Sequence, residues 1–145
     1  ETVFEHPSLN GEFFVLGQRT PSVSPSFSAN FDLNAVWHCG GYTEIHGEAT
    51  GTLSFSAPLS EAQLSLTGPA FILQSKLSLT NNADFSESSV VSSKLSINDQ
   101  SLTVGGSQVS GGLFGPTGTE IGVLLGYQTA SGGVGIMAIG KQTAN

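Results

Sequence analysis

Three side chains that could ligate a metal ion stand at alternate positions near the middle of the sequence: Glu44, His46 and Glu48. Alternate residues of an extended chain share a face, so the three would point the same way, at steps of about 6.6–6.8 Å. That spacing is too wide for one ion unless the strand bulges. His38, brought near by a turn at Gly40-Gly41, would complete a Zn²⁺ or Cu²⁺ site. The alternative is a solvated polar face without a ligand.

An aromatic ring and an imidazole lie side by side just before that stretch. Trp37 and His38 fall within residues 34–42, which the Gly40-Gly41 pair marks as a loop or tight corner. Aromatic side chains in loops can anchor interfaces. We therefore take Trp37, His38 and His46 as candidate ligand-binding residues. The alternative interpretation buries Trp37 in the core.

Nucleophilic catalysis would need a base beside a serine or cysteine. Cys39 follows His38, but neighbours on an extended chain point to opposite faces. The sequence contains no G-x-S-x-G motif. We therefore predict no catalytic residue and no enzymatic activity. Cys39 is the only cysteine, and a buried, inert thiol is favoured over pairing with another chain.

Composition narrows the class of protein further. The chain has 145 residues, which suits about one domain. Charged residues make up 10%, against roughly 25% in ordinary globular chains, and Ser, Thr, Gly and Asn replace them. With a net charge of −7 and only four basic residues, nucleic-acid binding is not expected. The sequence contains no run of about eighteen apolar residues, so no transmembrane helix is expected.

The elements that must position these residues are strands. Apolar residues alternate with polar ones over 43–57, 62–67, 71–79 and 91–97, and turn residues recur between them. A short helix from Ser60 is a lesser alternative. This pattern predicts an all-β fold, an antiparallel up-and-down β-barrel of about eight strands. We assign residues 11–145 to the barrel domain and residues 1–10 to a linker or N-terminal extension.

The closing stretch, residues 109–141, reads strand, turn, strand, turn, strand. Both faces of its last two strands are apolar or Gly, so another segment or a partner should cover the outer face, or the glycines allow close approach. Phe114 is expected to plug the barrel or its mouth. Gly122 and Gly126 are expected where side chains would crowd a curved wall. The motif residues of this stretch are Gly111, Gly112, Phe114, Gly115, Pro116, Glu120 and Gly122.

This motif resembles the closing hairpin of the barrel in the transferrin-binding protein B family of bacterial surface lipoproteins. Leu113, Gly126 and residues 133–141 also match, whereas the family often has a second aromatic at Leu113. Upstream, residues 11–17 with Thr20-Pro21 resemble the family's first barrel strand, and residues 47–55 a later one.

The resemblance implies a non-enzymatic binding module of a Gram-negative bacterium, surface-displayed, outer membrane-anchored or secreted, with the periplasm as the alternative. It implies nutrient acquisition (iron or haem) or host-protein binding, so the partner would be a protein or a small iron or haem ligand. Haem would need an axial His and an apolar slot, for which His38 beside Trp37 is the candidate. A neighbouring domain is expected outside this sequence. The alternative function is a structural, secretion-recognition or signalling barrel within a larger protein, without its own ligand.

Overall fold

The computed structural model describes residues 2–5, 14–23, 28–40, 45–55, 61–79, 83–85, 88–130 and 132–143. Within these ranges the chain forms strands, turns and connections, and no helix. None of the described segments is a helix long and apolar enough to cross a membrane. The all-β prediction is confirmed.

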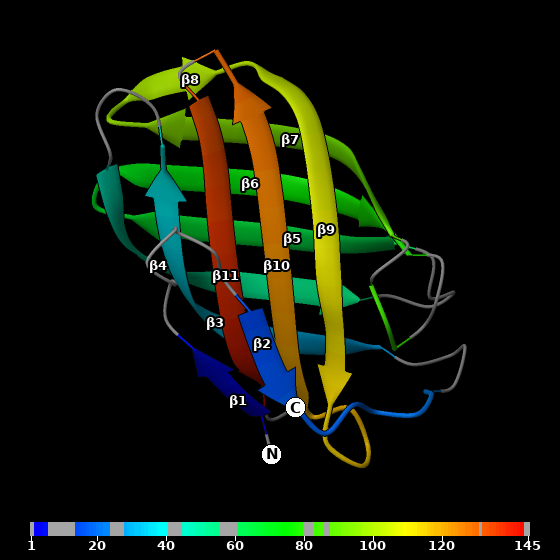
Figure 1. Ribbon diagram of the computed structural model, residues 1–145. Helices are drawn as coiled ribbons and strands as arrows, with labels where there is room; N and C mark the ends of the chain where they lie inside the picture. Colours follow the sequence, from blue (N-terminus) through cyan, green and yellow to red (C-terminus); the bar gives the residue numbers. More distant parts are fainter. Residues whose placement is uncertain are drawn as a thin grey trace.

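Nine strands form one antiparallel sheet in the order β8-β7-β6-β5-β4-β3-β11-β10-β9. Figure 1 shows β5, β6 and β7 crossing behind β9, β10 and β11, so the sheet curls into a nearly closed barrel. The antiparallel up-and-down barrel is confirmed, with nine strands in place of about eight. The strands are β3 (Ala29–Cys39), β4 (Ile45–Phe55), β5 (Glu61–Gly68), β6 (Phe71–Ser78), β7 (Ser89–Ile97), β8 (Gln100–Leu102), β9 (Val104–Phe114), β10 (Glu120–Thr129) and β11 (Gly132–Gln142).

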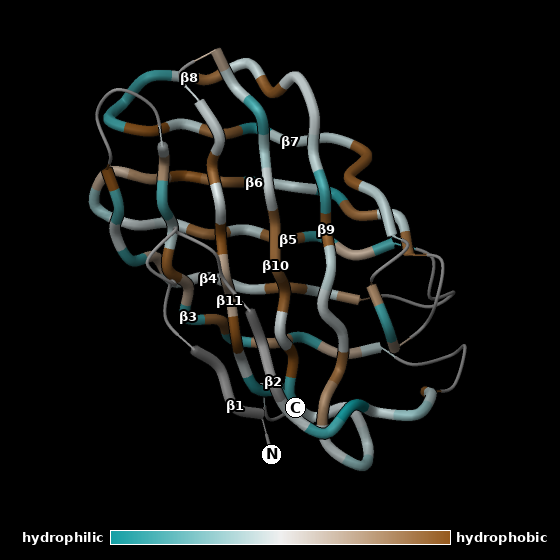
Figure 2. Tube along the Cα trace, viewed as in Figure 1, coloured by the Kyte–Doolittle hydropathy of each residue, from teal (hydrophilic) through white to brown (hydrophobic). Residues whose placement is uncertain are grey.

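Period-two alternation explains which side chains fill the barrel. Figure 2 shows apolar and polar residues alternating along the strands, as expected where one face is buried and the other is wet. Phe31, Leu53, Leu66, Leu73 and Ile136 are at most 1% exposed. The lesser helical alternative at Ser60 is wrong for the residues that follow, because Glu61 already begins β5.

The predicted loop at residues 34–42 is wrong over its first six residues. Alternation continues unbroken through β3, and its inward residues reach Trp37 and Cys39. This strand pairs on both sides, with β4 and with β11, so backbone ladders hold the segment extended up to Cys39. The strand ends at Cys39, just before Gly40, and its middle is not bent into a corner.

The predicted alternation over residues 91–97 places Val91 on the buried face with Leu95, and a bulge in β7 shows that this is wrong. The register with β6 shifts between Lys76 and Leu77, whose partners are Ser92 and Val90. Val91 is the extra residue, and its side chain is 56% exposed although its parity matches that of buried Leu95. A bulge moves every preceding residue to the other face, which alternation within one strand cannot reveal.

The closing stretch forms β9, β10 and β11 as predicted. Paired residues share a face, so Phe114, opposite Glu120, lies on the other side of β9 from Leu113, which pairs with inward-facing Ile121. Phe114 is buried to 1% exposure, with the guanidinium of Arg19 5.1 Å from its ring centre. Phe114 is therefore buried, but on the outer side of the barrel wall. The prediction that its ring lies inside the barrel is wrong, and the alternative position at the mouth stays a prediction.

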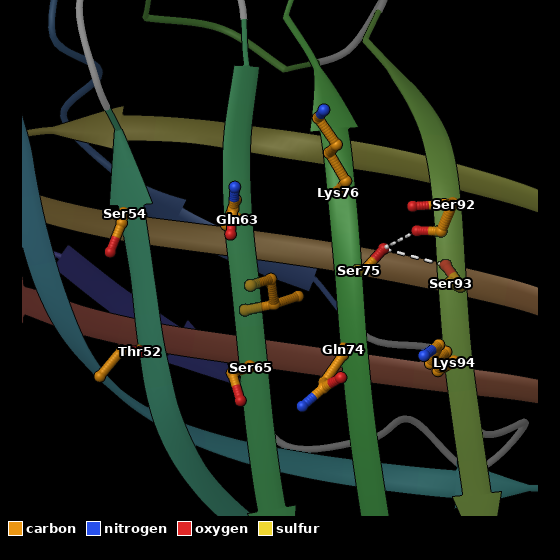
Figure 3. Close-up of a pocket in the computed structure, with 11 residues that line it drawn as sticks. Thr52, Ser54, Gln63, Ser65, Gln74, Ser75, Lys76, Ser92, Ser93 and Lys94 are labelled. Carbon is orange, nitrogen blue, oxygen red and sulfur yellow. Dashed lines mark hydrogen bonds between the residues drawn. The ribbon is translucent and has the colours of Figure 1, made fainter.

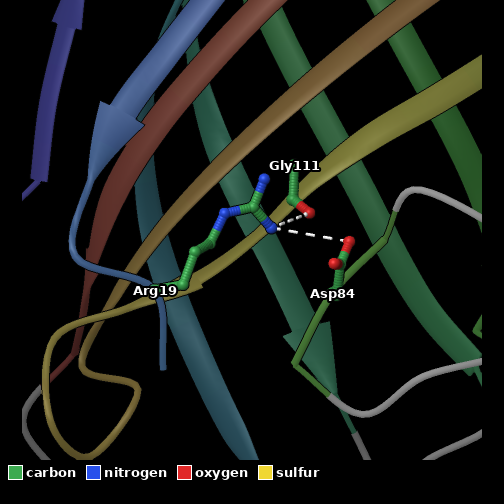
Figure 4. A network of polar contacts seen from close by, with 3 residues as sticks. All are labelled: Arg19, Asp84 and Gly111. Atoms are coloured by element: carbon green, nitrogen blue, oxygen red, sulfur yellow. Dashed lines mark hydrogen bonds and ion pairs between the residues drawn. The ribbon is translucent and has the colours of Figure 1, made fainter. Parts of the chain in front are cut away.

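The free edge of β9 is covered by two other segments. Arg19 and Asp84 form isolated bridges with Phe114 and Gly112 of this edge. The Arg19 guanidinium donates to the carbonyl of Gly111 at 2.7 Å and lies 3.5 Å from the Asp84 carboxylate, as Figure 4 shows. We call this arrangement of Arg19, Asp84, Gly111 and Phe114 the clasp.

A small hairpin lies outside the barrel. Strands β1 (Thr2–Glu5) and β2 (Phe14–Gly17) pair with each other and lie against β10, in front of the barrel in Figure 1. On the neighbouring β11, Met137 faces outward and is nevertheless 2% exposed. The same chain therefore covers part of the apolar outer face, as one of the two sequence alternatives predicted. The domain boundary at residue 10 stays a prediction.

Candidate functional site

The structure brings His38 and His46 together. They are directly paired residues of β3 and β4, and paired residues of antiparallel strands point to the same face. Both imidazoles lie on the outer side, because the residues next to His38, Trp37 and Cys39, are buried inside the barrel. His46 is exposed and His38 is half-buried.

Trp37 lies on the opposite face from this pair. Its ring stacks on Phe71 at a centroid distance of 5.0 Å and an interplanar angle of 18°. Its indole Nε1 is buried without a hydrogen-bond partner among the described residues. A Cβ at Gly47 would approach that nitrogen to 2.9 Å, so Gly47 makes room for the ring. Trp37 is thus a core residue by position, and Trp37, His38 and His46 do not converge on one point.

The proposed metal set is only partly described. Glu48 is exposed on the same face as His46, and it pairs across the ladder with Val36, one row away from the histidines. Glu44 lies outside the described residues. Within the described ranges, no three or more His, Cys, Asp or Glu side chains cluster closely enough to hold a metal ion. The set of Glu44, His46 and Glu48 therefore stays a prediction.

Beside His38 the outer face is hollowed into a groove of about 530 Å³, which we call the glycine groove. Gly135 pairs with His38 and Gly126 pairs with Gly135, so the row next to the imidazole carries no side chain. A Cβ added at Gly126 would meet nothing within 4 Å, which contradicts the predicted crowding there. Of the side chains that line this groove, those of His38, Gln108 and Gln128 belong to the outer face.

A second groove, the polar groove, crosses the outer face of β4, β5, β6 and β7 and has a volume of about 570 Å³. Figure 3 shows hydroxyl, amide and amino groups of adjacent strands lining it. Lys76 and Lys94, two of the chain's four basic residues, lie here, and the Lys76 ammonium is 3.1 Å from the Glu61 carboxylate. Its outward-facing residues are Thr52, Ser54, Gln63, Ser65, Gln74, Lys76, Ser92 and Lys94. Sequence alternation predicted a wet face here but missed its curvature, which depends on how the strands coil together.

The interior is filled by large side chains. Tyr127 is 1% exposed, and its hydroxyl lies 3.1 Å from Ser75 Oγ and 3.3 Å from Ser93 Oγ, across the barrel from β10 to β6 and β7. Burial raises the pKa of Tyr127 above 10, and the two serine hydrogen bonds oppose that shift. This network connects the two halves of the barrel and leaves the outer grooves as the accessible sites.

Cys39 and His38 lie on opposite faces of β3, as the extended backbone predicted. The Cys39 thiol is buried, its sulfur is 3.8 Å from the carbonyl oxygen of Gly40, and burial raises its pKa. A raised pKa lowers the thiolate fraction, so this sulfur is a poor nucleophile.

No protein-family description matches this sequence, and no curated protein is detectably similar to it. Solved structures are similar in fold. Transferrin binding protein B of serogroup B Neisseria meningitidis superposes with a TM-score of 0.69 at 17% identity, over 98% of this chain and 32% of that chain. A structure described as a surface lipoprotein gives 0.61 at 8% identity, over 98% and 76% of the two chains. A mutant of transferrin binding protein B from Actinobacillus pleuropneumoniae H49, described as a vaccine antigen, gives 0.61 at 7%, over the same shares.

These likenesses show that the chain has the barrel fold of transferrin binding protein B. The resemblance read from the closing hairpin is confirmed at the level of fold. The chain spans about a third of the length of the meningococcal protein.

Proposed function

We propose that this chain is a non-enzymatic binding module displayed on the surface of a Gram-negative bacterium, where it contacts a host protein. The observation that carries the proposal is the polar groove, an accessible hollow on the outer face of a barrel whose interior is filled. The fold shared with transferrin binding protein B and a surface lipoprotein supports the same location and class.

The chemistry of the polar groove suits a polar protein surface. Ser, Thr and Gln side chains adapt their hydrogen bonds to a partner, as they do in antibody paratopes. The net charge of −7 repels an acidic partner over most of the molecule, whereas Lys76 and Lys94 offer positive charge within this groove. We therefore propose that the partner presents an acidic, hydrogen-bonding region to β4–β7.

The finer proposal is that the partner belongs to nutrient acquisition, as an iron carrier or a haem source. Haem itself is tested separately, by mixing the protein with haem and recording the Soret band. His38 borders the glycine groove, but Trp37 lies on the other face, so the pairing of these two residues around haem finds no support in their positions. An unchanged Soret band would remove haem and leave a protein partner.

The test is binding of purified serum iron carriers, transferrin first, to the immobilised chain. We expect the double substitution Lys76→Glu and Lys94→Glu to weaken binding at least about tenfold, mostly through slower association. Lys141→Glu, at an exposed position of β11 outside the groove, makes one of the same charge changes and should leave affinity within about threefold. Equal affinities for the double variant and the native chain would refute the assignment of the partner to this face.

A structural barrel within a longer protein is the second candidate. It is favoured by the observation that the chain corresponds to 32% of the meningococcal protein. If no carrier binds, and if deleting this segment from the longer native protein causes its misfolding or loss of export, the structural function replaces the binding function.

A further inference from the structure

We propose that His38 and His46 together bind a transition-metal ion, Cu²⁺ in preference to Ni²⁺ or Zn²⁺, at the outer border of β3 and β4. The proposal rests on the register of these two strands and is independent of the proposed partner. The proposed ligands are one histidine from each of two paired strands, in place of the predicted set of Glu44, His46 and Glu48 along one strand.

The geometry of a paired position suits two imidazoles on one ion. Directly opposite residues of antiparallel strands have Cβ atoms about 4.5–5.5 Å apart. Imidazole nitrogens ligate at about 2.0–2.1 Å, so two rings leaning toward each other can reach one ion between them. By contrast, His46 and Glu48 are alternate residues of one strand, about 6.6 Å apart along the backbone. His38 and His46 are therefore better placed to share one metal ion than either histidine is to share one with Glu48.

The surroundings of the pair leave space and favour a cation. Gly135, on the other side of His38, has no side chain, and the imidazole borders the open glycine groove. Glu48 stands one row away on the same face, and the chain as a whole carries −7. No lysine or arginine is paired with either histidine in the described ladders of β3, β4 and β11. The electrostatic field at this border is thus attractive to a divalent cation.

The ligand type selects the class of metal. Neutral imidazole suits Cu²⁺, Ni²⁺ and Zn²⁺, and affinity for one nitrogen site rises to a maximum at Cu²⁺. A ligating histidine commonly donates its other ring nitrogen to a neighbouring acceptor, so further contacts of His38 are compatible with binding. Cys39 cannot serve as a third ligand, because its sulfur is buried on the inner face. The remaining coordination positions face the solvent and the glycine groove.

The experiment is calorimetric titration of the chelator-treated chain with Cu²⁺, Ni²⁺ and Zn²⁺, each added alone. We expect one Cu²⁺ per chain, with Ni²⁺ and Zn²⁺ weaker. His38→Gln and His46→Ala should each weaken Cu²⁺ binding at least about tenfold, since even outer-shell changes at metal sites cost 10–100-fold. Nitrogen hyperfine coupling in the electron paramagnetic resonance spectrum should report two imidazoles in the native chain and one in each variant.

Two control variants separate this site from other metal-binding groups. His6→Ala removes the third histidine of the chain, and Asp32→Asn removes an exposed carboxylate on the same face of β3, three rows away from His38; both should keep Cu²⁺ affinity within about threefold. Far-UV circular dichroism checks that every variant is folded. The proposal is overturned if the native chain binds no Cu²⁺, if both histidine variants keep native affinity, or if His6→Ala alone abolishes binding.

Discussion

The last three strands are joined to the rest of the barrel in two different ways. At one border, β11 and β3 share nine consecutive residue pairs, from Val134–Cys39 to Gln142–Phe31. At the other border, the edge of β9 lies near β7 without a described ladder between them, and two short segments pair with it through the isolated bridges of Arg19 and Asp84. The ladder depends on backbone groups that every residue supplies. The β9 edge has only a few backbone hydrogen bonds, to residues 18–20 and 83–85, and adds the particular side chains of the clasp. Single side-chain substitutions should therefore lower the free energy of unfolding more at the β9 border than at the β11–β3 border.

Inside the barrel, a third connection supports the weaker border. The hydroxyl of Tyr127 on β10 contacts Ser75 and Ser93, which also lie 2.9 Å from each other. This network joins β10 to β6 and β7, with which β10 shares no described ladder. The comparison can be tested by removing the clasp and the network one side chain at a time.

The largest effect is expected for Phe114→Ala. Phe114 is 1% exposed under Arg19, so truncation should lower the free energy of unfolding by about 3–5 kcal/mol. Denaturant unfolding measures this change. Ile72→Ala is the control, because Ile72 is an apolar residue 47% exposed on β6 and should cost no more than about 0.5 kcal/mol. Equal small costs would show that Phe114 does not hold the β9 border.

Arg19→Ala should have a smaller effect, of about 1–2 kcal/mol. It removes the 2.7 Å hydrogen bond to Gly111 and the contact with the Phe114 ring. The ion pair with Asp84 adds little, because both side chains are nearly half exposed. Lys141→Ala is the control, because it also removes a cation but lies in the β11–β3 ladder. Its free energy of unfolding should stay within about 0.5 kcal/mol of the native value. If both variants are equally stable, the contrast between the two borders is wrong.

Tyr127→Phe should cost about 1 kcal/mol, since Ser75 and Ser93 keep each other as partners. The native chain should also lose stability at alkaline pH through this residue. The pKa of Tyr127 is raised in the fold, so above pH 10 the unfolded state releases a proton that the native state retains. Stability from this group is complete below pH 10 and falls as the pH rises through the folded pKa. Urea unfolding between pH 8 and 11 should show a steeper decline for the native chain than for the variant, and parallel curves would contradict the assignment.

The smallest effect is expected for His46→Ala. Its side chain is exposed and lies away from both the clasp and the interior network, so without added metal stability should change by less than about 0.5 kcal/mol. The thermal midpoint of unfolding measures this. A loss above 1 kcal/mol would mean that the outer pair with His38 supports the fold itself.

The sequence by itself determined the strands and most of their buried faces. Alternation of apolar and polar residues is a local property, so β4, β5, β6 and β10 could be located without knowing their partners. The closing motif, from Gly111 to Gly122, carried the family resemblance that the solved structures confirm at the level of fold. Alternation also continues through residues 34–39, next to the glycine pair, and there the period of two indicates the structure better than the glycines do.

The tertiary structure alone decided how distant segments meet. The outward position of Val91 depends on a bulge against β6, and the outer burial of Phe114 depends on Arg19, which reaches Gly111 across 92 residues of sequence. The pairing of His38 with His46 follows from the register of β3 and β4, which a one-residue slip would have destroyed. Register and closure are set by the summed free energy of packing the whole barrel, so no single stretch of the sequence encodes them.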